Sequence, residues 1–374
     1  MKKVLKITVI VFACLMVLGG AAAFAASTTH SDLKGSKQEK AEKFVENYVK
    51  DEDFSGTILV MQKGKIVLDQ SYGKADKENN ILFSNDTLFP IGSITKSITA
   101  LAILQLEEQG KLSVKDPLAK YFPDLPNSKK ITIHQLLNHS SGYMDFFETP
   151  EIRKNYTKFH TDEEIVRSFA AKSLTAEPGE KFAYINSDYY LLGKIIEKVS
   201  GENYASYIEK NIFDKAGLDQ TFVMNEETME KVKVKGYEDG KLAEQIHPSL
   251  LIASGNVLST KSDIAKYLSA IESNKLLSPE QKEKMVSSSI KVNPIGIGYG
   301  YGWYSANGLI SFNEKEYVHG GSLPGLRVGV SHYPERDLSI IIFSNFDSEW
   351  NYSELMNGIA SIIFGKRQWF IHNL

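Results

Sequence analysis

The chain has 374 residues, of which 42% are hydrophobic and 24% charged, a composition typical of a globular protein with a large apolar core. Its formal net charge is −3, so the sequence provides no basic surface for nucleic acid. The only cysteine, Cys14, lies in an apolar segment near the N-terminus, which excludes disulfides, thiol nucleophiles and cysteine-bound zinc from the rest of the chain.

The start of the chain has the pattern of an export signal. Three lysines precede a nearly apolar run from Ile7 to Leu18, and small residues end in Ala23-Phe24-Ala25, an A-x-A cleavage pattern. Residues 7–26 also form an uncharged stretch long enough to cross a bilayer, so residues 1–26 are predicted to be a signal peptide or a membrane anchor. We therefore expect an extracytoplasmic protein, secreted or membrane-anchored at the outer face. Residues 27–40 are polar and are interpreted as a linker or a frayed start of the folded part.

The next segments predict a helix, a β-hairpin and a second helix. The first helix is expected from Gln38 to Val49. Two β-rich runs, from Gly56 to Met61 and from Lys65 to Gln70, flank Lys63-Gly64, which is a typical hairpin turn. The stretch from Phe89 to Leu106 favours one apolar helix.

The middle of the chain is dominated by helical patterns, and β-rich sequence returns near its end. The C-terminal β segments are expected at 299–304, 316–318, 327–333 and 338–344, followed by a helix over 352–364. Strands at both ends with helices between them predict an α+β fold, with one antiparallel β-sheet flanked by helices and built from both termini. We expect a sheet lobe from residues 41–115 and 278–374, a mostly α-helical lobe inserted at 116–277, and an active site between the lobes.

The first candidate catalytic pair is Ser93 and Lys96. On a helix these residues lie on one face about one turn apart, with Ser93 near the helix N-terminus, where the dipole favours a developing alkoxide. Burial and the same dipole disfavour the ammonium form of Lys96, which makes this lysine a plausible base. The S-x-x-K spacing alone is weak evidence, because it also occurs at three other places, Ser31/Lys34, Ser71/Lys74 and Ser288/Lys291.

Two further motifs carry polar groups that suit acyl transfer. Tyr184-Ile-Asn186 is the only Y-x-N sequence in the chain; a phenol near a lysine can relay a proton, and an amide can hold a substrate carbonyl. His319-Gly320-Gly321-Ser322 follows a predicted strand, and its glycines permit close approach of another backbone. Such a segment can bind an extended peptide, and its amide N–H groups can face an oxyanion.

Taken in this order, the three motifs resemble those of the serine β-lactamase and penicillin-binding protein superfamily. The resemblance is closest to its branch of class C β-lactamases and D-alanyl-D-alanine peptidases (DD-peptidases), whose pattern is S-x-x-K, then Y-x-N, then K-T-G or H-x-G. Leu136 to Gly142 and Ser254 to Thr260 are also similar to stretches of that family. The resemblance covers about residues 40–365 and implies a β-lactamase/transpeptidase-like fold.

This resemblance implies a role for each motif. Ser93 would attack a carbonyl and become acylated, and Lys96 and Tyr184 would move its proton to the leaving group. Asn186 would hold the substrate's amide side chain, and the backbone N–H groups of Ser93 and Ser322 would form an oxyanion hole. His319 stands where the class C β-lactamases have a lysine; a histidine near pH 7 can be neutral, so efficient β-lactamase action is not expected.

The resulting hypothesis is a hydrolase that works through an acyl-enzyme. The leading interpretation is a penicillin-sensitive DD-peptidase that acts on cell-wall or D-amino-acid peptides. A class C-like β-lactamase or an esterase is the alternative among enzymes. The alternative outside the enzymes is a penicillin-binding or sensor protein that is acylated but does not hydrolyse its acyl-enzyme. The expected partners are small peptides, esters or β-lactams, without nucleic acid. No cofactor or metal is expected, because the eight histidines show no paired ligand spacing.

Overall fold

The computed structural model describes residues 25–28, 33–52, 54–294, 296–347 and 352–371. The predicted export segment lies outside these residues except for its last two, so the structure does not address it. Within the described part of the chain, no helix is long and apolar enough to span a membrane.

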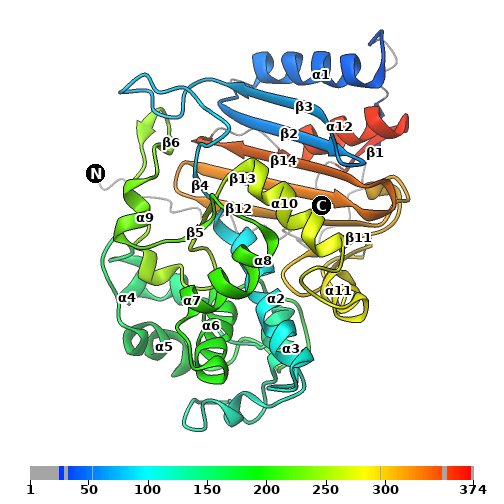
Figure 1. The fold of residues 1–374 in the computed structure, drawn as a ribbon. Coiled ribbons are helices and arrows are strands. Elements are labelled where there is room, and N and C mark those ends of the chain that lie inside the picture. Colours follow the sequence, from blue (N-terminus) through cyan, green and yellow to red (C-terminus); the bar gives the residue numbers. More distant parts are fainter. Residues whose placement is uncertain (1–24, 29–32, 53, 295, 348–351, 372–374) are drawn as a thin grey trace.

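An eight-stranded antiparallel sheet forms the centre of the fold, in the order β3-β2-β14-β13-β12-β11-β10-β9 (Figure 1). Its strands are β2 (Gly56–Gln62), β3 (Lys65–Tyr72), β9 (Ile290–Lys291), β10 (Ile297–Tyr299), β11 (Tyr304–Ala306), β12 (Glu316–Leu323), β13 (Leu326–Tyr333) and β14 (Leu338–Ser344). The N-terminal strand β2 pairs directly with the C-terminal strand β14. The predicted α+β fold, with an antiparallel sheet built from both ends of the chain, is therefore confirmed.

Helices cover both faces of this sheet. Because successive side chains of a strand point to opposite faces, Ile340 and Ile342 pack beneath α1 (Lys37–Asp51) and α12 (Tyr352–Phe364), whereas Ile341 and Phe343 join the core on the other side. On that other side α10 (Lys261–Glu272) packs against β2 and β14. Part of the segment 116–277, expected to form a separate helical lobe, therefore covers the sheet.

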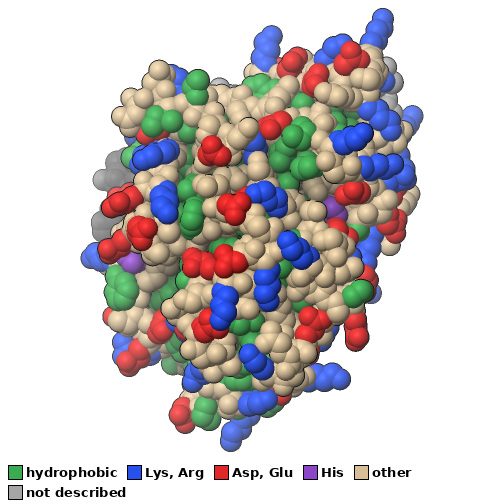
Figure 2. All heavy atoms as spheres, viewed as in Figure 1, with side chains coloured by type: hydrophobic (Ala, Val, Ile, Leu, Met, Phe, Trp, Pro, Cys, Tyr) green, Lys and Arg blue, Asp and Glu red, His purple; other side chains and the backbone are tan. Residues whose placement is uncertain are grey.

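The remaining helices gather on the α10 side of the sheet, below it in Figure 1. They are α2 (Thr95–Glu108), α3 (Ile133–Leu137), α4 (Pro150–Arg153), α5 (Asp162–Ala170), α6 (Asn186–Ser200), α7 (Tyr204–Ile208), α8 (Asp214–Ala216), α9 (Glu226–Glu230) and α11 (Pro279–Val286). Three small sheets complete the fold: β4 (Phe89–Pro90), β8 (Val257–Ser259) and β5 (Phe222–Val223); β15 (Phe346–Asp347), β6 (Tyr237–Glu238) and β7 (Lys241–Leu242); and β1 (Ala25–Thr28) with β16 (Gln368–Ile371). On the face in Figure 2, side chains of both charge signs are interspersed, in keeping with the small net charge.

The N-terminal part contains one confirmed turn and one wrong interpretation. Lys63 and Gly64 both have positive φ, +51° and +70°, and form the predicted hairpin turn between β2 and β3. Residues 27–40 are not simply a linker. Residues up to 28 belong to β1, and Ser36 caps α1 in a capping box with Glu39, so this helix starts at residue 37.

Two C-terminal predictions are also corrected. The expected strand 299–304 is the end of β10 and the start of β11, with a turn between them that includes Gly302 at φ +75°. The His319 motif does not follow a strand but lies inside β12. Only residues 316–318 of β12 pair with β11, so within the described chain the following residues have a strand partner on one side only, β13.

Candidate active site

Ser93 lies at the entrance to α2, although the helix does not begin where the sequence predicted. Phe89 and Pro90 form β4 and pair with β8, and Gly92 then turns the chain with φ +52°. A short 3₁₀-helix, η1 (Gly92–Ile94), leads into α2 at Thr95. Phe89 cannot extend the helix, because Pro90 disfavours helical geometry before it and Gly92 adopts a left-handed conformation. Ser93 nevertheless sits in the first helical turn, where backbone N–H groups lack intrahelical partners.

Lys96 is buried at the centre of the candidate site. Its Nζ lies 3.2 Å from Ser93 Oγ, which confirms that the S-x-x-K spacing brings the two groups within hydrogen-bond distance. The ammonium also donates to Asn186 Oδ1 at 2.8 Å and to the backbone carbonyl of Ser254 at 2.9 Å. Burial lowers the pKa of Lys96 to about 7, an effect that the Asp145 carboxylate opposes. Lys96 can therefore take up a proton from Ser93 near neutral pH.

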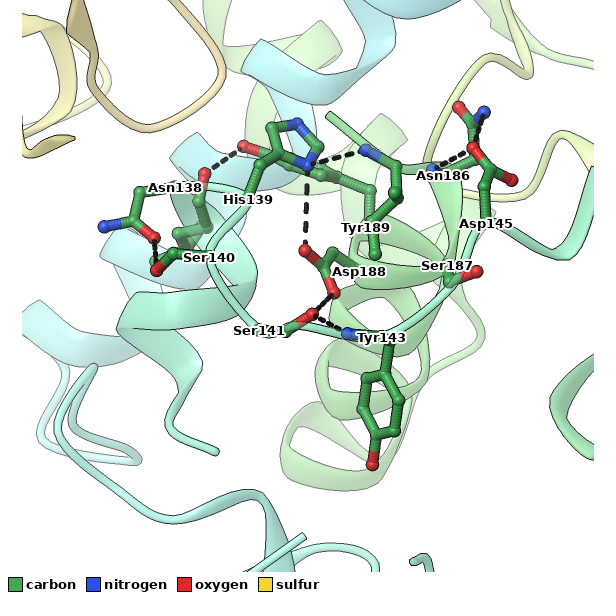
Figure 3. Close-up of polar contacts among 12 residues, drawn as sticks. Asn138, His139, Ser140, Ser141, Tyr143, Asp145, Asn186, Ser187, Asp188 and Tyr189 are labelled. Atoms are coloured by element: carbon green, nitrogen blue, oxygen red, sulfur yellow. Dashed lines mark hydrogen bonds and ion pairs between the residues drawn. The ribbon is translucent and has the colours of Figure 1, made fainter. Parts of the chain in front are cut away.

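Asn186 connects Lys96 to a buried carboxylate that sequence reasoning missed. The backbone N–H and the side-chain Nδ2 of Asn186 both donate to Asp145 Oδ2 at 2.9 Å (Figure 3). Burial raises the pKa of Asp145, while these two donors and the Phe147 N–H favour its ionised form. The oxygen and the nitrogen of the Asn186 amide thus both form hydrogen bonds within the protein, to Lys96 and to Asp145. Its expected contact with a substrate amide stays a prediction, whereas its contact with Lys96 is observed.

Tyr184 lies against Lys96, as the predicted proton relay requires. The Lys96 Nζ is 4.9 Å from the centroid of the Tyr184 ring. The Tyr184 hydroxyl is buried, and no described residue is placed to form a well-aligned hydrogen bond with it. Burial raises the pKa of this phenol, although the nearby Ser93 hydroxyl opposes the rise. The Tyr184 phenol is therefore neutral in the resting site, and of the two candidate bases Lys96 is the one whose pKa lies near 7.

The glycines of the third motif allow β12 to pack directly on the Ser93 turn. A Cβ on Gly321 would lie 2.0 Å from the Ile91 carbonyl oxygen and 3.3 Å from the Ser93 nitrogen. A Cβ on Gly92 would lie 2.9 Å from the Ser322 nitrogen. The backbone nitrogens of Ser93 and Ser322 are the ones expected to form an oxyanion hole. Both therefore lie next to the place where Gly92 and Gly321 pack together. Gly320 faces the opposite side of the sheet, where a Cβ would lie 2.3 Å from the hydroxyl of Tyr352.

His319 is buried and neutral. Its Nδ1 lies 2.7 Å from the Gly320 carbonyl oxygen, which can only accept, so this nitrogen carries the proton. Its Nε2 lies 3.1 Å from the Tyr299 hydroxyl and can accept a hydrogen bond from it. Burial lowers the pKa of His319 to about 3, and the charge of Lys96 acts in the same direction. The expectation of a neutral histidine at this position agrees with these contacts.

Four residues near the motifs had no role assigned from sequence: Ser254, Asp145, Tyr299 and His139. The stretches that begin at Ser254 and include His139 were recognised as family-like, and family comparison was the only signal for them. Asp145 and Tyr299 belong to no spacing pattern. Asp145 contacts Asn186 and Tyr299 contacts His319, each from a different segment of the fold. Among the described residues, no group of three or more His, Cys, Asp and Glu side chains could hold a metal ion.

Known proteins are similar to this chain in sequence and in fold. The sequence model of the Beta-lactamase family matches residues 41–357. PbpX of Bacillus subtilis (strain 168), named as a putative penicillin-binding protein, is 31% identical over 323 residues, 85% of this chain and 78% of that protein. The teichoic acid D-alanine hydrolase of Staphylococcus aureus (strain MRSA252) is 29% identical over 67% of this chain and 62% of its own length.

Among solved structures, the octameric penicillin-binding protein homologue from Pyrococcus abyssi is similar, with a TM-score of 0.78 and 32% identity. The match covers 87% of this chain and 77% of that chain. This chain belongs to the Beta-lactamase family, within the serine β-lactamase and penicillin-binding protein superfamily. The protein is an enzyme, a serine hydrolase of this superfamily.

Proposed function

We propose that the protein hydrolyses D-amino-acid peptides through an acyl-enzyme on Ser93, in the manner of a DD-peptidase. The observation that carries the proposal is the 3.2 Å contact between Lys96 Nζ and Ser93 Oγ, together with a Lys96 pKa lowered to about 7. A serine hydroxyl needs a neighbouring base to become a nucleophile, and Lys96 is this base. The similarity to penicillin-binding proteins and to a teichoic acid D-alanine hydrolase supports a D-alanyl substrate.

Acylation follows from the arrangement of the site. Neutral Lys96 accepts the proton of Ser93 as its oxygen bonds to the substrate carbonyl carbon. The N–H groups of Ser93 and Ser322 stabilise the resulting oxyanion. When the carbonyl carbon releases the leaving amine, the Tyr184 hydroxyl donates a proton to it and is reprotonated from Lys96. Water then attacks the acyl-enzyme, releases the acid and returns a proton to Ser93.

The test is intact-protein mass spectrometry during incubation with benzylpenicillin, alongside D-alanine release from a peptide ending in D-Ala-D-Ala. We expect a long-lived adduct of one penicillin and release of D-alanine, both abolished by Ser93→Ala. Ser288→Ala is the matched control, because Ser288 is exposed and belongs to another S-x-x-K sequence. Free penicilloate without a lasting adduct would indicate a β-lactamase. An adduct without hydrolysis of any peptide or ester would indicate a sensor.

A second candidate function is hydrolysis of D-aminoacyl esters or amides that lack a free carboxylate. The specific observation is His319, which is neutral and hydrogen-bonded at the position where the class C β-lactamase pattern has a lysine. A neutral side chain offers a substrate carboxylate no charge partner. We expect faster hydrolysis of a D-alanyl ester than of the D-Ala-D-Ala peptide, and His319→Lys should shift the ratio toward the peptide. An unchanged ratio would remove this candidate.

We also propose that the protein is exported and acts outside the cytoplasm, either secreted or held by its N-terminal segment. The support is the basic start, the apolar run and the A-x-A pattern over residues 1–26. Fractionation of cells expressing the full chain, with N-terminal sequencing of the product, tests this. A protein beginning near residue 26 in the medium indicates cleavage, an intact chain in the membrane indicates an anchor, and an intact chain in the cytosol contradicts export.

A further inference from the structure

A buried histidine lies directly behind Tyr184 and has no part in the proton transfer described above. His139 follows α3, is fully buried, and its ring centroid is 4.4 Å from that of Tyr184. It does not contact Ser93 or Lys96 through any hydrogen bond of the described residues. Its ring also packs on Phe182, Tyr189 and Tyr299, but the ring of Tyr184 is the nearest of the four.

His139 binds the chain on both sides of Tyr184. Its backbone carbonyl accepts a hydrogen bond from the Ala183 N–H at 2.8 Å. Its ring Nδ1 accepts one from the Ile185 N–H at 3.3 Å. Because residues 183 and 185 flank the tyrosine, these two bonds fix the backbone that carries the Tyr184 ring. The hydroxyl has no comparable anchor among the described residues, so the ring depends on its backbone and on packing for its position.

A second group of buried polar residues lies beside His139. Its backbone φ is +58°, a left-handed conformation that costs free energy for any residue with a side chain. The Asp188 Oδ2 lies 3.7 Å from its Nδ1, and Asp188 Oδ1 accepts a hydrogen bond from Ser141 Oγ at 2.5 Å (Figure 3). Burial lowers the pKa of His139 and raises that of Asp188, so it disfavours the charged form of each. A neutral ring can keep Nδ1 unprotonated, as the bond from Ile185 requires.

We propose that His139 is a positioning residue that holds Tyr184 in place for proton transfer between Ser93 and the leaving group. It acts through two backbone hydrogen bonds and ring contact, without touching the substrate. The inference rests on the proposed function of Tyr184 as a proton relay. A misplaced relay slows acylation and leaves ground-state binding nearly unchanged, because a shift of about 1 Å in a reacting group costs on the order of 10²-fold in rate.

The test compares two substitutions of His139. His139→Leu keeps an apolar side chain of similar bulk but removes the acceptor. His139→Asn keeps a side-chain oxygen near the place of Nδ1, and asparagine tolerates positive φ better than most residues. His332→Leu is the matched control, because His332 is also buried, hydrogen-bonded to Ser339 and neutral, but lies in β13, where its ring packs on Tyr317. Each variant is also made in the Tyr184→Phe background.

The readout is the first-order rate constant of Ser93 acylation by a fluorescent penicillin and the dissociation constant of the preceding complex. An activated p-nitrophenyl ester is measured as a second acyl donor; its phenolate leaves without a proton, so its acylation should change little. We expect His139→Leu to slow acylation about 10²-fold with binding changed less than about threefold. His139→Asn should restore most of the rate. In the Tyr184→Phe background, His139→Leu should cost less than about threefold, because the residue it positions no longer relays a proton.

Equal loss in both backgrounds would overturn the inference, since it would show an effect on folding or on Ser93 itself. The same loss in His332→Leu, or no rescue by His139→Asn in a protein with unchanged melting temperature, would also overturn it. Failure of the proposed function is a separate result: wild-type protein would be acylated by the ester but would release no D-alanine from the peptide.

Discussion

The lowered pKa of Lys96 makes a strong prediction about the pH dependence of acylation. Its value falls from 10.5 to about 7, mainly because the ammonium is buried. At 1.36 kcal/mol for each pKa unit, this difference corresponds to about 5 kcal/mol of disfavoured charge. At pH 7 about half of Lys96 is neutral, compared with roughly one molecule in 3,000 for an unperturbed lysine. The fold thus supplies a base that would otherwise be protonated.

The sign of the pH effect follows from this role. Lys96 must be neutral to accept the Ser93 proton, so the second-order rate constant of acylation should fall tenfold per pH unit below about 7 and level off above it. Asp145 raises the pKa of Lys96, so Asp145→Asn should move this acid limb to lower pH. The exposed Asp124→Asn is the matched control and should leave the profile unchanged.

The assay is stopped-flow acylation by a fluorescent penicillin between pH 5 and 9, with the active fraction determined by titration of Ser93. A profile that is flat through pH 7, or an acid limb that moves to higher pH in Asp145→Asn, would refute the reasoning. In either case Lys96 would not be the base, and the proton of Ser93 would have to leave by another route.

Three further predictions concern neighbouring parts of the fold. Glu316 is buried in β12 and its pKa is raised to about 7, so the native state favours its protonated form and loses stability as the pH rises from 4.5 through 7. Glu316→Gln should stabilise the protein by up to about 3 kcal/mol at pH 8 and hardly at all at pH 4.5, as measured by urea unfolding; equal effects at both pH values would contradict this. Gly321→Ala should lower the acylation rate by at least about 10²-fold, because its Cβ would collide with the Ile91 carbonyl and displace the oxyanion hole; wild-type acylation kinetics would contradict the close contact. Tyr184→Phe should slow turnover on the order of 10²-fold. If this variant hydrolysed a D-alanyl substrate at the wild-type rate, the phenol would not relay the proton.

Several features followed from the sequence because they depend on residues close together in the chain. The Ser93–Lys96 contact needs only one helical turn, and the hairpin at Lys63-Gly64 needs only two residues that tolerate positive φ. The β-rich sequence of residues 327–333 and 338–344 predicted the two C-terminal strands within one residue. The start of α2 was predicted wrongly, because the pairing of Phe89 with Ser259 in β8 is a contact between distant segments.

The tertiary structure decided which groups surround these motifs and what charge they carry. The Ser254 carbonyl contacts Lys96, Asp145 contacts Asn186, and His139 contacts the backbone beside Tyr184. Each does so from a segment dozens of residues away, so no local spacing reveals them. The pKa values likewise depend on burial, which is a property of the assembled core. The sequence by itself determined the order and chemistry of the candidate catalytic side chains. Only the packing of β12 against η1 and of α6 against α2 decided their distances and the neutral states that the proposed acyl transfer requires.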